Sequence, residues 1–225
     1  MKFFVIEGLD GSGKSTQIKL LKEYFTKNKI VHQYIHFPRT DSGVFGDLIA
    51  RFLRGELGDI NHVHPYLVAL IYAGDRKDTS GIIEQWLKEE YTVLLDRYVY
   101  SNIAFQCAKI EDPSERQKLK NWIYHLEYEY FKIPKPDLSL FLDVPLTFTE
   151  KKLAFNRKGE DRNYLQGVKD IHEENIEFQK KVREVYLREV REEENFKLIN
   201  CYGQKGEMLP PQVIFNQILK TLNLD

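Results

Sequence analysis

The feature that most constrains this chain is a glycine-rich run near its N-terminus. It follows an apolar run at 3–6, precedes a helical pattern that begins at Gln17, and reads Gly8-Leu9-Asp10-Gly11-Ser12-Gly13-Lys14-Ser15-Thr16. Glycines at this spacing let backbone N–H groups converge on phosphate oxygens, and the following helix directs the positive end of its dipole to the same place. The order of strand, loop and helix therefore predicts a phosphate-binding loop. A glycine-rich turn without a nucleotide is the alternative, and the flanking patterns disfavour it.

This spacing is the Walker A pattern, and it assigns roles to individual side chains. We expect Lys14 to reach the outer phosphates of a bound nucleotide, and Ser15 to supply a hydroxyl ligand to Mg²⁺. The other nucleotide-binding residues predicted in the loop are Gly8, Gly11, Ser12, Gly13 and Thr16.

The composition limits the classes of protein to consider. The chain has 225 residues, which suffices for one large domain with a full core and does not require two. With 33 Lys and Arg against 34 Asp and Glu, it lacks the basic excess that favours a nucleic-acid partner. No apolar run is long enough to span a bilayer, and the N-terminus has no signal-peptide layout. We therefore expect a single domain over 1–225 in a soluble, cytoplasmic protein that binds neither nucleic acid nor membrane.

Strand-like and helix-like segments alternate along the chain. Five short apolar segments are rich in β-branched and aromatic residues, and helical patterns lie between them. This order predicts an α/β fold in which helices cover both faces of a five-stranded parallel sheet. The predicted strands lie at 3–6, 30–37, 92–95, 138–142 and 196–200, and the predicted helices at 17–25, 44–54, 65–87, 114–131, 147–155, 168–193 and 211–222.

Charged residues follow the predicted strands, at the sheet edge where ligands bind in such folds. Asp96 ends the third strand, where it is placed to hold Mg²⁺ directly or through water; a carboxylate that only caps the strand end is the alternative. Arg39 and Arg97 follow the second and third strands. Together they suit a second anionic group, although either one alone is typical of a surface ion pair. These residues indicate phosphoryl transfer to a phosphorylated acceptor rather than hydride or acyl transfer.

The combination of motifs resembles the thymidylate kinase family over residues 3 to about 167. The motifs follow the family's order and spacing, and the block that begins at Asp96 is far more selective than the phosphate loop alone. They are residues 7–16, Phe37-Pro38-Arg39, Asp75-Arg76, Asp96-Arg97-Tyr98-Val99-Tyr100-Ser101-Asn102-Ile103-Ala104-Phe105-Gln106, Pro136-Asp137-Leu138 and Leu142-Asp143-Val144-Pro145. The resemblance implies the P-loop NTPase fold, Mg²⁺, and transfer of the γ-phosphoryl group of ATP to dTMP, giving dTDP and ADP, in dTTP biosynthesis.

The resemblance also implies roles in an acceptor site. Arg39 and Arg97 would grip the acceptor phosphate, and Asp10 would face the deoxyribose 3′-hydroxyl. Tyr72 would stack on the base, where the family commonly has Phe; without the resemblance, an aromatic residue on an amphipathic helix is typical of a core. The other substrate-binding residues implied are Arg76 at the base O4, Asn102 at its N3 edge, Phe105 where a ribose 2′-hydroxyl would lie, and Ser101 in the same block.

A cationic, glycine-bearing loop within about 157–167 is the predicted short lid. Members of the family place a catalytic arginine either in the phosphate loop or in the lid, and here Gly11 occupies the phosphate-loop position. The resemblance therefore assigns this role to the lid, with Arg157 preferred; solvated basic loop residues are the alternative. The predicted catalytic residues are Lys14, Arg97, Arg157 and Arg162.

Two other functions remain open on the sequence. One is a kinase of the same fold with another acceptor, such as a nucleoside or dUMP, because a missing methyl group changes binding by only about 1–3 kcal/mol. The other is a regulatory P-loop protein that holds a nucleotide without an acceptor. Against it, the chain has no Asn-Lys-x-Asp guanine signature, and the two strand-end arginines would have no task. Because the family forms homodimers, a homodimer is expected, and the apolar residues of 64–87 agree with one.

Overall fold

The computed structural model describes residues 2–58, 62–154, 165 and 176–224. Within them, five strands form one parallel sheet, as the sequence predicts, and the structure shows their order to be β2-β3-β1-β4-β5. The strands are β1 (Phe3–Gly8), β2 (His32–His36), β3 (Thr92–Asp96), β4 (Leu138–Asp143) and β5 (Phe196–Asn200). Parallel neighbours need crossover connections, so the intervening helices cover both faces of the sheet.

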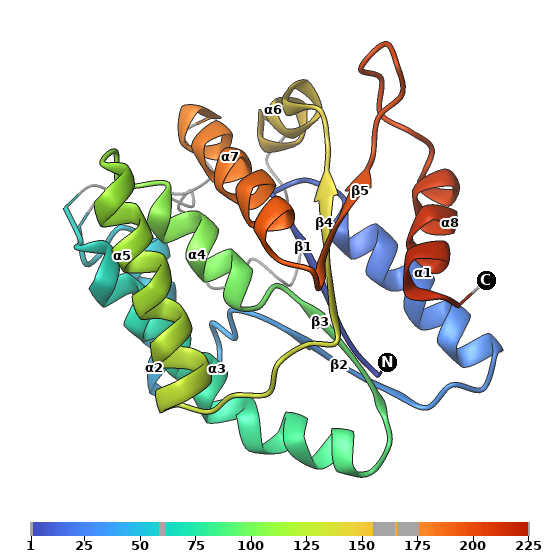
Figure 1. Ribbon diagram of the computed structural model, residues 1–225, viewed down its shortest axis with the longest axis horizontal. Helices are drawn as coiled ribbons and strands as arrows, with labels where there is room; N and C mark the ends of the chain where they lie inside the picture. Colours follow the sequence, from blue (N-terminus) through green and yellow to red (C-terminus); the bar gives the residue numbers. More distant parts are fainter. Residues whose placement is uncertain (1, 59–61, 155–164, 166–175, 225) are drawn as a thin grey trace.

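Two layers of helices enclose the sheet (Figure 1). α1 and α8 lie on one side, and α3, α4, α5 and α7 lie on the other, with α2 packed against α3. The helices are α1 (Lys14–Lys27), α2 (Gly43–Leu53), α3 (Pro65–Lys88), α4 (Val99–Cys107), α5 (Pro113–Tyr124), α6 (Leu146–Ala154), α7 (Ile176–Glu192) and α8 (Pro211–Leu222). In the described part of the chain, no helix has the length and apolar character needed to cross a membrane.

The central strand β1 divides the core into two halves by the alternation of its side chains. Phe3 and Val5 pack toward the α3, α4 and α7 layer, whereas Phe4 and Ile6 pack toward α1 and α8. All four are almost completely buried. Burying a side chain of this size contributes about 1.5–3 kcal/mol. The strand that leads into the phosphate loop is therefore fixed from both faces.

The structure differs from the sequence prediction in two helical regions. The predicted helix over 114–131 is two elements, because α5 ends at Tyr124 and continues as a wider π-helix, η1 (His125–Tyr130). The short helix α4 was not predicted. All nine of its residues are buried, so it has no polar face from which a helical period can be read. The predicted helix that starts at 168 is described only from Ile176, where α7 begins.

Candidate active site

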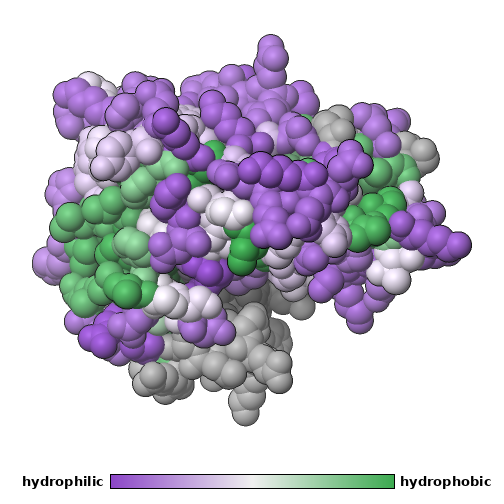
Figure 2. Space-filling view, turned by 90° about the horizontal axis from the view of Figure 1, so that it is seen from below, coloured by the Kyte–Doolittle hydropathy of each residue, from purple (hydrophilic) through white to green (hydrophobic). Residues whose placement is uncertain are grey.

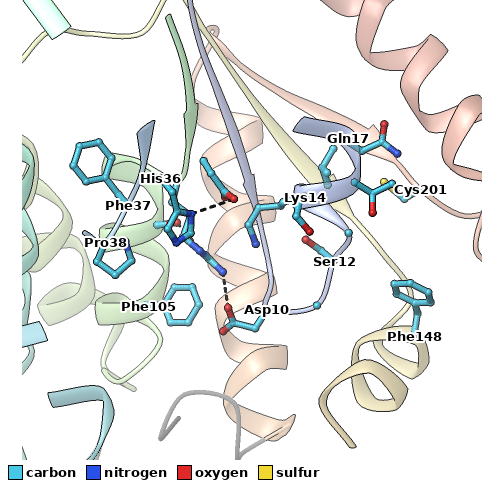
Figure 3. A pocket seen from close by; sticks show the side chains of 18 of the residues that line it. Asp10, Ser12, Lys14, Gln17, His36, Phe37, Pro38, Phe105, Phe148 and Cys201 are labelled. Atoms are coloured by element: carbon cyan, nitrogen blue, oxygen red, sulfur yellow. Dashed lines mark hydrogen bonds and ion pairs between the residues drawn. The ribbon is translucent and has the colours of Figure 1, made fainter. Parts of the chain in front are cut away.

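A cleft of about 670 Å³ runs along the carboxyl ends of the strands, lined by residues that end or follow all five strands and by residues of α3. It has three parts, and Figure 3 labels members of each: Asp10 and Lys14, then Phe105, then Phe148 and Cys201. The loop centre comprises Asp10, Lys14, Asp96 and Arg97. The α4 end comprises Tyr72, Arg76, Asn102 and Phe105. The β5 end comprises Phe148, Cys201, Met208, Leu209 and Ile214.

The phosphate loop takes the conformation that its glycines allow. Gly11 and Gly13 have positive φ angles of 77° and 85°, in the left-handed region that favours glycine. At Gly8, a Cβ atom would approach Ser12 Oγ to 2.5 Å, so a larger residue there would displace the Ser12 hydroxyl, even though Gly8 does not itself line the cleft. The other predicted loop residues line it, and they are Gly11, Ser12, Gly13, Lys14, Ser15 and Thr16.

Lys14 lies in the loop centre, with its ammonium group held by the loop backbone. Its Nζ donates to the carbonyl oxygens of Gly8 (3.3 Å) and Leu9 (3.0 Å). Burial lowers the pKa of Lys14 to about 8, and the charge of Arg97 acts in the same direction, although nearby carboxylates oppose both. At neutral pH the ammonium group is thus charged but incompletely compensated, and an anion bound in the loop would stabilise it.

Asp96 ends β3 beside this loop, and one of its carboxylate oxygens is paired. Oδ2 lies 3.2 Å from Nδ1 of His36, which ends the neighbouring strand in register. Burial by itself raises the pKa of Asp96, but the hydrogen bond from His36 and the charge of Lys14 outweigh it and lower that pKa. The buried Oδ1 finds no hydrogen-bond partner among the described residues. A charged oxygen is therefore left to take a cation or a water molecule.

Arg97 has a φ of 67°, which residues other than glycine rarely adopt. Its Nη2 donates to Asp10 Oδ1 (2.6 Å), and its Nη1 donates to Ser101 Oγ (3.2 Å). Gln179 on α7 donates to the other oxygen of Asp10 (3.1 Å). Burial disfavours the Arg97 cation, but Asp10 and Asp96 raise its pKa. Arg97 therefore remains a charged group at the wall of the cleft.

Glu7, in β1, holds the start of α4. Its carboxylate accepts hydrogen bonds from the backbone N–H groups of Tyr98 (2.8 Å) and Ser101 (3.3 Å) and from the hydroxyls of Ser101 (2.5 Å) and Tyr186 (3.0 Å). Burial raises the pKa of Glu7, while these bonds oppose that rise. The first N–H groups of a helix have no partner within it, so a carboxylate at this point fixes the helix in place. β1 thus determines where α4 lies relative to the phosphate loop.

Two aromatic rings line the α4 end. Tyr72 reaches it from α3 and Phe105 from α4. The Phe105 ring centroid lies 5.2 Å from the Arg97 guanidinium carbon, and Phe178 of α7 packs edge-on against the same ring with a centroid distance of 6.1 Å. Phe105 therefore joins this end of the cleft to the loop centre.

A buried polar group closes the α4 end. Arg76 donates to the two carboxylate oxygens of Glu127 through Nε (2.5 Å) and Nη2 (2.7 Å), and Asn102 Nδ2 donates to Glu127 Oε1 (3.0 Å). Burial disfavours the Arg76 cation, but the charge of Glu127 outweighs it and raises the pKa of Arg76. Arg76 and Asn102 line the cleft while Glu127 lies behind them.

The structure pairs Arg39 with Asp75 of α3. Its backbone N–H and its Nε each donate to the Asp75 carboxylate (both 2.9 Å), and its Nη2 donates to the Asp75 carbonyl oxygen (3.1 Å). Pro38 and Thr40 line the cleft, whereas Arg39 does not. Of the two predicted phosphate-binding arginines, only Arg97 lies in the cleft wall.

Several residues along the cleft have a buried side-chain oxygen atom without a hydrogen-bond partner among the described residues. Four residues that line it have a buried side-chain oxygen with no hydrogen-bond partner among the described residues: Ser12, Gln17, Asp96 and Asn102. Such atoms are uncommon in folded proteins because leaving one unpaired costs about 1–3 kcal/mol. Their gathering in one cleft indicates a site built for a polar ligand.

Comparisons with known proteins agree on one family. The thymidylate kinase family model matches residues 6–208. A probable thymidylate kinase of Methanococcus maripaludis is 34% identical over 224 residues, which are 98% of this chain and 94% of that protein. The thymidylate kinase of Plasmodium falciparum is 31% identical over 188 residues, which are 82% of this chain and 75% of that one. The chain belongs to the thymidylate kinase family.

A solved structure supports the same assignment. The thymidylate kinase of Candida albicans superposes with a TM-score of 0.73 at 26% sequence identity, and the match covers 99% of this chain and 92% of that one. The predicted P-loop NTPase fold is thereby confirmed. As a member of the thymidylate kinase family, the chain is a kinase.

Two predicted features of a thymidylate kinase lie outside the described residues. These are the lid at about 157–167, apart from the buried Leu165, and the two arginines assigned to it, Arg157 and Arg162. Their roles stay predictions.

The sequence did not indicate several residues of the site. His36 could have been predicted, because it lies at the end of the second predicted strand, as Asp96 lies at the end of the third. No sequence pattern indicates Glu127 or Gln179, because each reaches the site from a helix far along the chain. No sequence pattern indicates the β5 end either, because its apolar residues come from three separate segments and share no motif.

Proposed function

We propose that this kinase is a thymidylate kinase, which transfers the γ-phosphoryl group of ATP to dTMP and yields dTDP and ADP. The observation that carries the proposal is the pairing of a donor and an acceptor at the α4 end, on Arg76 and Asn102, in a cleft that continues to the phosphate loop. Thymine presents an acceptor at O4 beside a donor at N3–H, whereas cytosine reverses both groups. The acceptor base would lie against these side chains, with Tyr72 and Phe105 beside it.

The loop centre would hold the reacting phosphates. Both nucleotides bound along the strand ends would bring an acceptor phosphate oxygen into line with the γ-phosphoryl group, and this positioning supplies much of the catalysis. Lys14 would leave its carbonyl partners for the transferring phosphate, and Arg97 would stabilise charge on the acceptor phosphate. A phosphate dianion is already nucleophilic, so no general base is required.

The residues of the loop centre fit a magnesium ion. Asp96 Oδ1, which has no hydrogen-bond partner among the described residues, and the hydroxyl of Ser15 are oxygen ligands of the kind that Mg²⁺ prefers. When bound, the ion would neutralise charge on the donor phosphates. Asp96 would be kept charged for this role by His36 and Lys14.

The β5 end would receive the adenine of ATP. Figure 3 shows Phe148 and Cys201 on the side of the phosphate loop opposite Phe37 and Phe105. Apolar side chains there offer a surface for a planar base. Gln17 lines the same cleft, and its side-chain oxygen has no hydrogen-bond partner in the part of the chain that the structure describes.

An ADP-release assay with ATP and Mg²⁺ tests the proposal when dTMP, dUMP, dCMP, dGMP and thymidine are offered in parallel. We expect strong turnover with dTMP, weaker turnover with dUMP and none with thymidine. ADP release that does not depend on an acceptor would point to a hydrolase or a switch, and would contradict the acceptor site.

We also propose that the protein is cytoplasmic and forms a homodimer through α2 and α3. Val44, Leu67 and Ile82 are more than half exposed on these helices, at 73%, 58% and 51%. Figure 2 shows hydrophobic side chains gathered on the side where α2 and α3 lie in Figure 1. Analytical ultracentrifugation that finds only a 26.7 kDa species would contradict the dimer.

A further inference from the structure

The polar group at the α4 end is assembled from three separate elements. Arg76 comes from α3, Asn102 from α4 and Glu127 from the π-helix η1. Their relative exposures are 2%, 2% and 0%. π-helical turns are rare and occur often at functional sites. The widened turn here places one carboxylate behind two side chains that line the cleft.

Hydrogen bonds to Asn102 determine which way its amide faces. Nδ2 has two hydrogens, and two acceptors lie at hydrogen-bond distance: Glu127 Oε1 (3.0 Å) and the carbonyl oxygen of Ala69 (3.0 Å). A flipped amide would place its oxygen against both acceptors, which would be repulsive. Oδ1 must therefore be the free acceptor, and it has no partner among the described residues.

The same carboxylate fixes the neighbouring donor. Glu127 takes Nε and Nη2 of Arg76 in a two-point contact, which sets the plane of the guanidinium group. Glu127 Oε1 accepts from Arg76 and from Asn102 at once, so the two side chains are held next to each other. Glu127 does not line the cleft, but it thus fixes the orientation of the hydrogen-bond donor and the acceptor that line it.

We propose that Glu127 is a specificity-determining positioning residue, which orients Arg76 and Asn102 to accept a pyrimidine with a keto oxygen beside an N–H. This rests on the proposed function, because it assumes that the acceptor base binds at the α4 end. Thymine and uracil have this pattern. Cytosine offers an amino donor to Arg76 and a ring acceptor to Asn102, so both contacts oppose it.

The Glu127→Gln variant tests the inference. An amide cannot accept at both positions, so either Arg76 loses a partner or Asn102 faces an N–H group and is driven to flip. We expect the ratio of kcat/KM for dTMP to that for dCMP to fall by at least about tenfold, chiefly through a higher KM for dTMP. Glu129→Gln is the matched control, because Glu129 lies in the same π-helix but is exposed and contacts His125.

Binding of a non-hydrolysable ATP analogue, measured by calorimetry, reports whether each variant is folded. Glu127→Asp supplies a second folded test, because it keeps the charge but is too short to reach both partners, and the same loss of selectivity is expected. Unchanged selectivity in a folded Glu127 variant would overturn the inference, as would failure of both Glu127 variants to bind the analogue. If the unaltered protein itself does not prefer dTMP to dCMP, the proposed function fails and the inference fails with it.

Discussion

The loop centre and the α4 end of the cleft are built on different principles. In the loop centre, each charged group has a partner that a ligand can replace: Lys14 is bonded to loop carbonyls, and Arg97 to Asp10. At the α4 end, Arg76 and Glu127 form an ion pair that is almost completely buried. Breaking such a pair leaves an uncompensated buried charge and costs about 3–5 kcal/mol.

This difference separates groups that change partners from groups that keep them. Phosphoryl transfer needs positive groups that can contact the negative charge as it develops on the transferring phosphate. Lys14 and Arg97 can do so because a ligand can replace their present hydrogen-bond partners. Base selection needs donors and acceptors that stay in place, since discrimination depends on a wrong base finding them unpaired. We therefore expect changes in the loop centre to lower kcat, and changes at the α4 end to alter KM and selectivity.

The largest effect is expected for Lys14→Met. It removes the cation that would stabilise the transferring phosphate, and kcat should fall by about 100- to 1,000-fold. Calorimetric affinity for dTMP should remain close to that of the unaltered protein, because the α4 end is untouched. Lys19→Met, at an exposed position of the same helix, is the control. A parallel loss of dTMP affinity would show that the two regions do not act separately.

A smaller loss is expected for Arg97→Ala. One charged hydrogen-bonding group to the acceptor phosphate is removed, so turnover should fall by about 10- to 100-fold. Affinity for an ATP analogue should change far less, and steady-state kinetics together with calorimetry would measure both quantities. The exposed Arg191 provides the control substitution to Ala. Equal losses in turnover and in ATP affinity would contradict the role given to Arg97.

A different kind of effect, on stability and not on turnover, is expected next to the α4 end. Lys109 Nζ donates to Gln106 Oε1 (2.8 Å) and lies 4.9 Å from the Phe52 ring centroid, and burial lowers the pKa of Lys109 to about 7. Between that value and the ordinary lysine pKa of about 10.4, the unfolded chain binds more protons than the folded one. The free energy of unfolding should therefore rise with pH in this window, by up to about 1.4 kcal/mol per pH unit from this group.

Lys109→Met should lack this contribution. Urea denaturation from pH 6 to pH 10 would measure it as a difference from the unaltered protein, with Lys77→Met, an exposed position of α3, as control. If the free energies of unfolding of the Lys109→Met variant and the unaltered protein change in parallel across this pH window, the prediction is wrong. Water or nearby groups then stabilise the charged form of Lys109.

The sequence by itself determined the fold and the loop centre. The phosphate loop is a run of consecutive residues whose glycine spacing suits phosphate binding, and short apolar segments rich in β-branched and aromatic residues predicted all five strands. Asp96 and Arg97 could be placed in the site because the carboxyl ends of parallel strands meet at one edge of the sheet.

The resemblance named the residues of the α4 end, but only the tertiary structure decided how they are assembled and which partners the charged groups have. Glu127, Asn102 and Arg76 are separated by about 25 residues from one to the next, and no local pattern records that they meet. The continuous helical pattern over 114–131 concealed the π-helix that carries Glu127, because a wider turn changes the side-chain directions without changing the composition. Local chemistry can be read from neighbours in the chain, whereas a buried network forms only when distant helices pack together.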